Sequence, residues 1–400
     1  MLSTLFDHNP DLKRLLDEGF NVSLSSSDNH LLLRDVPYVA SDKTVRYGTL
    51  VAPLTLNGHK LNPPADHVVH FVGRQPCDKD GVEIAQIKNA ENLRDLDKGL
   101  RIDRTFSARP PEPFKDYYEK LTSYVRILEA PAKAVDPGAT AKTFAPYQPG
   151  ENESVFKYTD TASSRAGISA ISAKLSAEKI GIVGLGGTGS YVLDLVAKTP
   201  VAEIHIFDGD VFASHNAFRS PGAPTIEQLH DRPSKVRHFG EIYANIRRGI
   251  SVHEGFIDPD GPQNLNALTF VFLCMDGGSA KKAIIQDLIG QHIPFVDVGI
   301  GLGEVNSTLQ GLLTTTTATT AKNDHIARRI SFAEPTGDDE YNHNIQVAEL
   351  NALNAALAVI KWKKLRGFYA DSSQEHFTVY TIEHNTLINE ECHAAQVSSV

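Results

Sequence analysis

Four glycines in the segment KIGIVGLGGTGSYVLDLVAKTP have the spacing that suits the binding of phosphate groups. They are Gly184, Gly186, Gly187 and Gly189. An apolar run before them predicts a short buried strand, and the apolar stretch after them, which Pro200 ends, predicts a helix. Glycine permits a tight turn, and it lets the backbone N–H groups of a helix N-terminus approach a phosphate. The segment therefore predicts a nucleotide-binding turn, and the alternative is a turn that only packs the helix against the sheet.

A carboxylate stands where an acid that binds a ribose is expected. Asp208 ends the next strand-like run, VAEIHIFD, 19 residues after Gly189. This position suits the ribose of NAD as well as that of ATP. The glycines and this acid therefore leave the choice of nucleotide open.

Polar residues further along the chain favour a nucleoside triphosphate with a metal ion. They occur in FDGDVFASHNAFRS, in RPSK and at the end of LCMD, and they are Asp210, Asn216, Arg219, Lys235 and Asp276. Adenylation requires Mg²⁺ on the phosphates and cations on the departing pyrophosphate, whereas the pyrophosphate of NAD needs no such set. Asp276 is the candidate metal ligand, and Arg219 and Lys235 are the candidate phosphate-binding cations.

The elements that must position these residues alternate between strands and helices from about residue 158 onward. KIGIV, VAEIHIFD, SVHEGFI, LTFVFLCMD and IPFVDVGI are strand-like runs, with helical sequence between several of them. This alternation predicts an α/β fold with a Rossmann-like, doubly wound and mostly parallel sheet. The Thr-rich EVNSTLQGLLTTTTATT breaks the pattern and predicts antiparallel strands at one end of the sheet. NIQVAELNALNAALAVIKWKKLRG predicts a long helix that ends before Gly367.

The first part of the chain has a different pattern and predicts a smaller α+β domain. An amphipathic helix at the start, short β-like runs and a helix near residues 116–128 are followed by a stretch rich in Pro, Ala, Gly and Thr. Such a stretch predicts a linker. We place the boundary near residue 150, which gives an N-terminal domain with its linker over residues 1–150 and a nucleotide-binding domain over residues 151–400.

The composition excludes several classes of protein. The 400 residues include 39 Lys and Arg against 49 Asp and Glu, a formal net charge of −10, which disfavours binding to duplex DNA or to an anionic membrane. No run of ~18 apolar residues predicts a transmembrane helix. The three cysteines, Cys77, Cys274 and Cys392, form no C-x-x-C pair and support neither a disulfide framework nor a thiolate zinc site. We therefore expect a cytoplasmic protein with no nucleic acid and no membrane among its partners.

The glycine turn, the pattern D-G-D-x-x-x-x-x-N-x-x-R after it, Lys235 and Asp276 together resemble the ThiF/MoeB-type adenylyltransferases, which share the fold of ubiquitin-activating enzymes. The resemblance covers roughly residues 158–370. It implies that ATP and Mg²⁺ activate the C-terminal glycine of a ubiquitin-like protein as an acyl-adenylate. It also implies a homodimer and an acceptor protein like a conjugating enzyme. The N-terminal part resembles, in general character only, the extra region that accompanies ThiF-type domains in bacterial gene clusters for ubiquitin-like conjugation.

The resemblance assigns roles to the site residues. Asp208 would hold the ribose hydroxyls, Asp210 belongs to the same nucleotide-binding motif, and Asp276 would bind Mg²⁺. The residues that would contact the phosphates are Asn216, Arg219 and Lys235. Arg165, just before the first strand of the domain, matches the place from which the family supplies an arginine across its dimer interface.

The cysteines set this chain apart from the family it resembles. Many relatives carry two C-x-x-C pairs for a structural zinc, and this chain has none, so we predict no zinc. Ubiquitin-activating members also carry a catalytic cysteine in a crossover segment. The matching segment here, about residues 319–343, contains no cysteine.

Three routes beyond the adenylate therefore stay open. The acyl group passes directly to a thiol or amine of a partner, or it forms an oxyester on Ser331 or Thr336, or it is received by Cys77. A hydroxyl nucleophile needs a base, and His325 and His343 are the candidates. We expect Cys274 in the core, because it lies within a predicted buried strand, and Cys392 in an incidental tail position. Cys77 stands in the turn-like GRQPCDKDG, where a cysteine is open to exposure.

Two other functions compete with adenylation. An NAD-dependent oxidoreductase would use the same glycine turn and the same Asp208, but it has no reason to assemble the cations and carboxylates that follow. An inactive scaffold of this fold would bind a ubiquitin-like partner without chemistry. The presence of Arg219, Lys235 and Asp276 argues against the scaffold.

Overall fold

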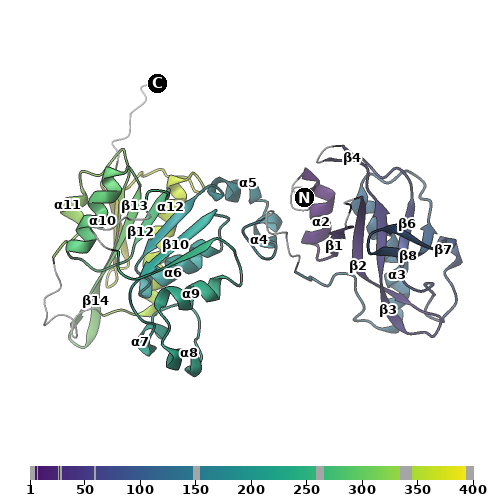
Figure 1. The fold of residues 1–400 in the computed structure, drawn as a ribbon, viewed down its shortest axis with the longest axis horizontal. Coiled ribbons are helices and arrows are strands. Elements are labelled where there is room, and N and C mark those ends of the chain that lie inside the picture. The colour runs from purple at the N-terminus through teal and green to yellow at the C-terminus, as the bar shows by residue number, and fades with distance from the viewer. Residues whose placement is uncertain are drawn as a thin grey trace, which may run out of the picture. The chain divides into compact units, whose positions relative to one another are not determined.

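The chain folds into two compact units, Met1–Gly167 and Ile168–Val400 (Figure 1). The computed structural model describes residues 5–6, 8–25, 27, 29–57, 60–146, 154–257, 265–333 and 345–392. The boundary predicted near residue 150 falls within 147–153, which lies outside the described residues. Residues 154–167, which were predicted to be part of the second domain, belong to the first compact unit.

The N-terminal unit is built on an antiparallel sheet of six strands in the order β1-β2-β3-β6-β8-β7. The strands are β1 (Asn21–Leu24), β2 (His30–Val39), β3 (Val45–Pro53), β6 (Val68–Val72), β7 (Lys88–Asp97) and β8 (Leu100–Ser107). A separate pair is formed by β4 (Leu56–Asn57) and β5 (Lys60–Leu61), and a 3₁₀ turn, η1 (Ala85–Ile87), precedes β7. The predicted α+β character of this unit is confirmed.

Helices α2 (Pro10–Asp17) and α3 (Tyr117–Val135) contribute Leu12, Leu15, Leu121 and Tyr124 to the core of this unit. Helix α3 begins at the N-cap Asp116, whose carboxylate accepts a hydrogen bond from the Glu119 N–H. It runs seven residues beyond the predicted end at residue 128 and contains Pro131. The Ala-rich sequence around Pro131 has high helix propensity, and Ala132 is buried, so packing carries the helix past the proline. The last helix of the unit is α4 (Thr161–Arg165).

The C-terminal unit contains an eight-stranded sheet in the order β11-β10-β9-β12-β13-β14-β15-β16. The strands are β9 (Lys179–Val183), β10 (Glu203–Asp208), β11 (Ile250–Glu254), β12 (Phe270–Leu273), β13 (Phe295–Val305), β14 (Thr308–Ala318), β15 (Phe377–Thr381) and β16 (Thr386–Glu390). The first five strands in this order pair in parallel, and β13 to β16 pair antiparallel. The predicted Rossmann-like sheet with antiparallel strands at one end is confirmed, and the Thr-rich segment is strand β14.

Helices cover both faces of this sheet (Figure 1). On one face α6 (Gly187–Ala197), α9 (Lys235–Tyr243) and α12 (Ala348–Leu365) pack against Ile180 and Ile182 of β9. On the other face α10 (Ser279–Gly290) and α11 (Ile326–Arg329) pack in a core that includes Val183 and Val271. Because successive residues of a strand point to opposite faces, burial on both sides explains why these strands are continuous apolar runs.

Short helices complete the unit: α5 (Ser169–Ser172), the 3₁₀ turn η2 (Ala173–Leu175), α7 (Ser214–Ala217) and α8 (Ile226–Asp231). Within the described residues, no helix is both long enough and apolar enough to span a membrane.

Candidate active site

A cavity of about 620 Å³ opens where the parallel strands of the C-terminal unit end. Its lining includes Gly184 directly after β9, Asp208 at the end of β10, and the residues from Cys274 to Gly277 directly after β12. Open parallel sheets bind their ligands beyond the carboxyl ends of the strands. The cavity therefore lies where this architecture places a ligand site.

At Gly184 and Gly189 the glycine turn passes so close to its neighbours that a side chain does not fit. Gly184 has φ +88°, and a Cβ there would lie 2.5 Å from the carbonyl oxygen of Cys274. A Cβ on Gly189 would lie 1.9 Å from the carbonyl oxygen of Gly184. Gly186 and Gly187, which begin α6, line the cavity. The helix N-terminus therefore faces the cavity with N–H groups that suit an anion.

Asp208 ties the glycine turn to the end of β10. Its Oδ2 accepts a hydrogen bond of 2.6 Å from the Leu185 N–H, and its Oδ1 accepts one of 2.8 Å from the Asp210 N–H. Lys235, the buried first residue of α9, donates to Asp210 Oδ2 at 2.6 Å and has its Nζ 3.7 Å from Asp208 Oδ1. The structure thus brings the predicted ribose acid and one predicted phosphate cation to the same wall of the cavity.

Arg219 supplies a second cation to the cavity. Burial lowers the pKa of Arg219, and the carboxylates of Asp276 and Asp210 act in the opposite direction. Its Nε is buried and has no hydrogen-bond partner within the described residues. Asn351 of α12 donates to the backbone carbonyl of Arg219 at 3.4 Å and holds this part of the chain. Arg219 therefore has a hydrogen-bond donor available for an anion.

Asn216 and Gly189 do not line the cavity. Asn216 is 2% exposed, and its Oδ1 accepts a hydrogen bond of 2.9 Å from the Ala213 N–H. Its Nδ2 has no hydrogen-bond partner within the described part of the chain. The contacts of Asn216 hold the loop that leads to Arg219, and its predicted role at the phosphates stays a prediction.

Asp276 is an exposed residue that follows β12 and lines the cavity. Across the ranges that the structure describes, no three or more His, Cys, Asp and Glu side chains gather into a metal site. Mg²⁺ at nucleotide sites is commonly bound by one or two protein carboxylates together with the substrate phosphates and water. A single carboxylate beside the phosphate-binding turn therefore fits an Mg²⁺ ion that is held partly by the nucleotide.

The cavity wall contains a buried ion pair that the sequence pattern did not predict. Lys281, in the first turn of α10, and Asp297, in β13, both line the cavity, and their Nζ and Oδ1 atoms are 2.5 Å apart. Lys281 also donates to the carbonyl oxygen of Met275 at 3.2 Å, the residue before Asp276. The pair therefore fixes the loop that carries the candidate metal ligand. The signal in the sequence was a carboxylate inside the apolar run IPFVDVGI.

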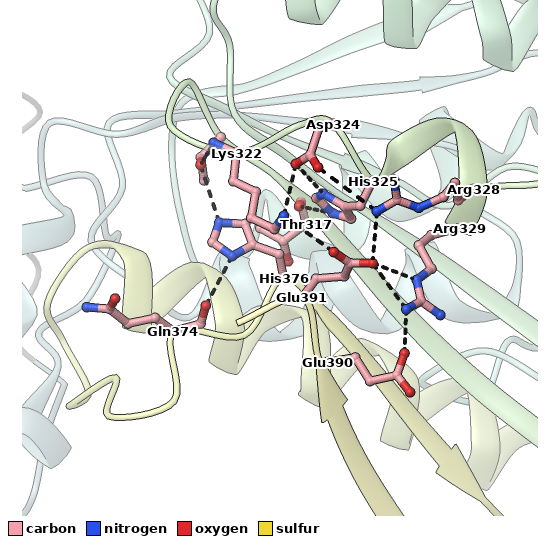
Figure 2. A network of polar contacts seen from close by, with 11 residues as sticks. Thr317, Lys322, Asp324, His325, Arg328, Arg329, Gln374, His376, Glu390 and Glu391 are labelled. Atoms are coloured by element: carbon pink, nitrogen blue, oxygen red, sulfur yellow. Dashed lines mark hydrogen bonds and ion pairs between the residues drawn. The ribbon is translucent and has the colours of Figure 1, made fainter. Parts of the chain in front are cut away.

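The crossover segment contributes Arg329, Ile330 and Ser331 to the cavity lining. The exposed Ser331 accepts a hydrogen bond of 3.4 Å on its Oγ from the Ala333 N–H. His325, one of the two candidate bases, is fully buried, and its Nε2 lies 3.0 Å from the Thr317 carbonyl oxygen (Figure 2). It does not line the cavity. Thr336 and His343 lie outside the described residues.

A network of ion pairs holds this segment against the end of β16 (Figure 2). Arg329 donates to Glu390 Oε2 at 2.5 Å and to Glu391 Oε1 at 3.1 Å. Glu391 also pairs with Lys322 at 3.3 Å and with Arg328 at 3.4 Å. Partial burial acts to raise the pKa of Glu391, but hydrogen bonds from these three cations lower it below its ordinary value. The two glutamates therefore fix the cavity wall that contains Arg329 and Ser331.

The three cysteines differ in how far they are exposed to solvent. Cys77 is 1% exposed, so the expectation that its turn exposes it is wrong: its N–H donates to the Val39 carbonyl oxygen, and burial raises the pKa of its thiol. Cys274 borders the cavity, and burial raises its pKa as well. Cys392 is exposed. Arg165 is an exposed residue of the N-terminal unit, with its guanidinium 5.6 Å from the ring centre of Phe144, and its role across a dimer interface stays a prediction.

Comparisons with known proteins match both units. A family model described as "ThiF family" matches residues 162–394, and one described as "Domain of unknown function (DUF6791)" matches residues 10–161. No curated protein matches the sequence.

Several solved structures are distantly similar to the chain. The Microcin C7 biosynthetic enzyme MccB in complex with N-formylated MccA is 14% identical, with 57% of this chain and 68% of that chain covered and a TM-score of 0.44. E. coli MccB with succinimide is 15% identical, with 60% and 74% covered and a TM-score of 0.44. E. coli tRNA N6-threonylcarbamoyladenosine dehydratase, TcdA, in complex with AMP is 18% identical, with 51% and 92% covered and a TM-score of 0.36.

Substitution of Gly189 by Ala is expected to destabilise the C-terminal unit by about 2–3 kcal/mol, because the new Cβ would overlap the Gly184 carbonyl. Gly186→Ala is the matched control, since a Cβ there meets nothing within 4 Å. Urea unfolding of both variants measures the difference. Equal loss of stability in the two variants would show that the close approach does not constrain the turn.

Substitution of Asp297 by Asn is expected to change how stability depends on pH. Burial raises the pKa of Asp297 from 3.8 to about 6, with Lys281 acting against this rise. The folded protein therefore holds a proton that the unfolded chain loses between about pH 4 and pH 6, so this carboxyl makes the free energy of unfolding fall as the pH rises through that window, by about 3 kcal/mol.

The Asn variant lacks this titration. The difference in unfolding free energy between the wild type and Asp297→Asn should change between about pH 4 and pH 6 and become constant above about pH 7. Urea titrations at several pH values measure it. A difference that stays constant over the whole range would contradict the assignment.

Proposed function

Because this chain belongs to the ThiF family, we propose that its C-terminal unit uses ATP to adenylate a carboxylate. The observation that carries the proposal is that one cavity is lined by the start of α6, by the cations Arg219 and Lys235, and by the carboxylate Asp276, which follows the parallel strand β12. An oxidoreductase has no use for this combination. The finer statement, that the carboxylate belongs to the C-terminal glycine of a ubiquitin-like protein, is part of the same proposal.

The cavity offers a separate place for each part of the nucleotide. The N–H groups at the start of α6 would receive phosphate oxygens, and Asp208, at the wall beside them, would hold the ribose. Phe256 and Ile257, which also line the cavity, supply an apolar surface for the base. Phe256 is 80% exposed and lies against Gly209, so it is open to stacking on a purine.

The chain's part in the reaction is to orient the reactants and neutralise charge. A carboxylate oxygen of the substrate attacks the α-phosphorus of ATP, the bond to the bridging oxygen breaks, and pyrophosphate leaves with the negative charge. Arg219 and Lys235 would stabilise that charge. Lys235 donates to Asp210 in the structure, so a phosphate would share or replace this contact. Mg²⁺ held by Asp276 would supply further neutralisation when bound.

The part of the cavity lining that β13 and β14 supply suits the narrow end of a polypeptide. Gly299 and Gly301 of β13 line the cavity together with Leu312 and Thr314 of β14. Gly301 leaves the strand surface open, since a Cβ there would lie 3.9 Å from Leu312, whereas the Thr314 hydroxyl would lie 2.5 Å from a Cβ on Gly299. An extended tail that ends in glycine would therefore lie beside Gly301. This feature supports a C-terminal glycine as the substrate.

The positions of Ser331, Cys77 and Cys274 bear on which nucleophile would receive the acyl group. Ser331 lines the cavity, whereas Cys77 is buried in the N-terminal unit and Cys274 has a raised pKa. Neither cysteine is suited to act as a thiolate. We propose direct transfer to an acceptor protein like a conjugating enzyme, or an oxyester on Ser331, as the two routes beyond the adenylate. A homodimer, with Arg165 reaching the site of its partner, belongs to the same proposal.

Replacement of Asp276 or of Arg219 by Ala is expected to reduce ATP–pyrophosphate exchange by at least about 100-fold, because each removes charge stabilisation of the phosphates. The exchange is measured with the ubiquitin-like protein, here called the carrier, as the substrate. The exposed Asp231 and Arg237, each replaced by Ala, are the matched controls and should exchange like the wild type. Full exchange in both site variants would contradict the roles given to Asp276 and Arg219, and absence of exchange in the wild type would contradict adenylation. Tight binding of NAD in place of ATP with Mg²⁺ would favour the oxidoreductase, and a wild type that binds the carrier without exchange would favour the scaffold.

Any covalent adduct between enzyme and carrier is expected to be stable to thiols, labile to base and absent in Ser331→Ala. Trapping the adduct and treating it with thiol, hydroxylamine and base measures this. Ser373→Ala, at an exposed position outside the cavity lining, is the control. A thiol-labile adduct would refute the serine, and full exchange with no adduct would identify direct transfer.

A further inference from the structure

The N-terminal unit contains a second cavity, of about 800 Å³, which the proposed adenylation does not use. Residues of β2, β3, β7 and β8 and of the turn after β6 line it. Three of these residues are arginines: Arg46, Arg74 and Arg104. Such a concentration of cations is notable in a chain with a net charge of −10.

Strand register places two of the arginines on the same face of the sheet as the core. Arg46 of β3 lies opposite Tyr38 of β2, and Arg104 of β8 lies opposite Phe71 of β6. Directly opposed residues project to the same side. Because Tyr38 and Phe71 are buried in the core, the cavity continues the core face of the sheet into a charged region.

The turn after β6 is built to present Arg74. The Gly73 N–H donates to Asp103 Oδ2 at 2.7 Å, and the Arg74 N–H donates to the Tyr38 hydroxyl at 2.9 Å. A Cβ on Gly73, at φ +150°, would lie 2.7 Å from the Phe71 ring, so this turn requires glycine. The exposed guanidinium of Arg74 has no ion-pair partner within the described residues.

The other two arginines are oriented by one carboxylate each and keep unused donors. Arg46 pairs with Asp42 at 2.8 Å, and Arg104 pairs with Glu91 at 2.7 Å. The Nε atom of each is buried and has no hydrogen-bond partner in the described part of the chain. A buried N–H without a partner is unfavourable, and a ligand oxygen in the cavity would supply one.

The charge of the lining selects the ligand. Arg46 and Arg104 are each paired with a carboxylate, so Arg74 is the guanidinium of the lining that lacks an ion-pair partner within the described residues. A single ligand carboxylate would supply that partner, whereas a phosphate dianion would bring a second negative charge close to Glu91 and Asp103. Tyr47 and Leu93, 56% and 65% exposed, add apolar surface to the lining. We propose that this cavity binds a peptide through one carboxylate, gripped by the planar arginine side chains, and through an apolar residue next to it.

The proposal is tested on the full-length protein by fluorescence anisotropy with three labelled peptides. The first is Ser-Gly-Leu-Leu with a free C-terminal carboxylate, the second is the same peptide amidated, and the third is Ser-Glu-Leu-Leu amidated. The first and third should bind and the second should not, and whichever of the first and third binds more tightly identifies a C-terminal or a side-chain carboxylate as the natural group. Inorganic phosphate, added at a concentration about 10-fold above the Kd of the peptide, should not displace the peptide.

Arg74→Gln and Arg104→Gln are each expected to weaken binding about 10-fold or more, because each removes a charged hydrogen-bond donor. Arg101→Gln is the matched control, since Arg101 is an exposed arginine of the same strand β8 outside the cavity lining. Arg74 is exposed, so its variant tests the site without disturbing the core, and thermal unfolding confirms that it folds. Absence of binding by all three peptides, displacement by phosphate, or equal affinity of Arg74→Gln and wild type would overturn the proposal.

Discussion

The candidate active site depends on the close approach of three backbone segments at one edge of the parallel sheet. The Gly184 N–H donates to the Phe207 carbonyl oxygen at 2.8 Å, and the Cys274 N–H donates to the Val183 carbonyl oxygen at 2.8 Å. Asp208 adds its carboxylate to the N–H of Leu185 at 2.6 Å. The ends of β9, β10 and β12 therefore form one rigid edge. This edge fixes the backbone positions of Asp208 and Asp276, although the two residues are far apart in the sequence.

The two buried cations Lys281 and Arg219 in the cavity wall differ in how far the protein itself neutralises their charge. This difference matches the roles proposed for them. Lys281 is paired with Asp297 and hydrogen-bonded to the Met275 carbonyl oxygen, so its charge is offset within the protein. Arg219 keeps a buried Nε without a partner in the described chain, and its pKa is lowered by burial. A bound phosphate would offset the free-energy cost of burying the Arg219 charge. Lys281 is therefore suited to stabilising the structure, and Arg219 is suited to binding a ligand.

Sequence patterns predicted the parts of the structure that depend on local chemistry. The glycine turn, the strand-end acids and the Thr-rich antiparallel strand followed from short-range spacing, because turn geometry and strand periodicity are local properties. The Lys281–Asp297 pair did not, since it joins a helix to a strand through a contact that only the folded sheet creates. Cys77 looked exposed because it stands among turn residues, yet its backbone pairs with Val39 and buries it. Helix α3 passed its predicted end because packing of Ala132 outweighed the presence of Pro131.

The ion-pair network at the end of β16 holds one wall of the cavity through partly exposed charges, whereas backbone hydrogen bonds hold the glycine turn. Arg328 and Glu390 are substantially exposed, with 62% and 45% of their side chains accessible, so dissolved ions reach the network. Ionic strength screens such pairs, whereas the backbone hydrogen bonds of the glycine turn are indifferent to it. The wall with Arg329 and Ser331 should therefore loosen as ionic strength rises, while the glycine turn keeps its form. The conformation of this wall should therefore depend on ionic strength, and that of the glycine turn should not.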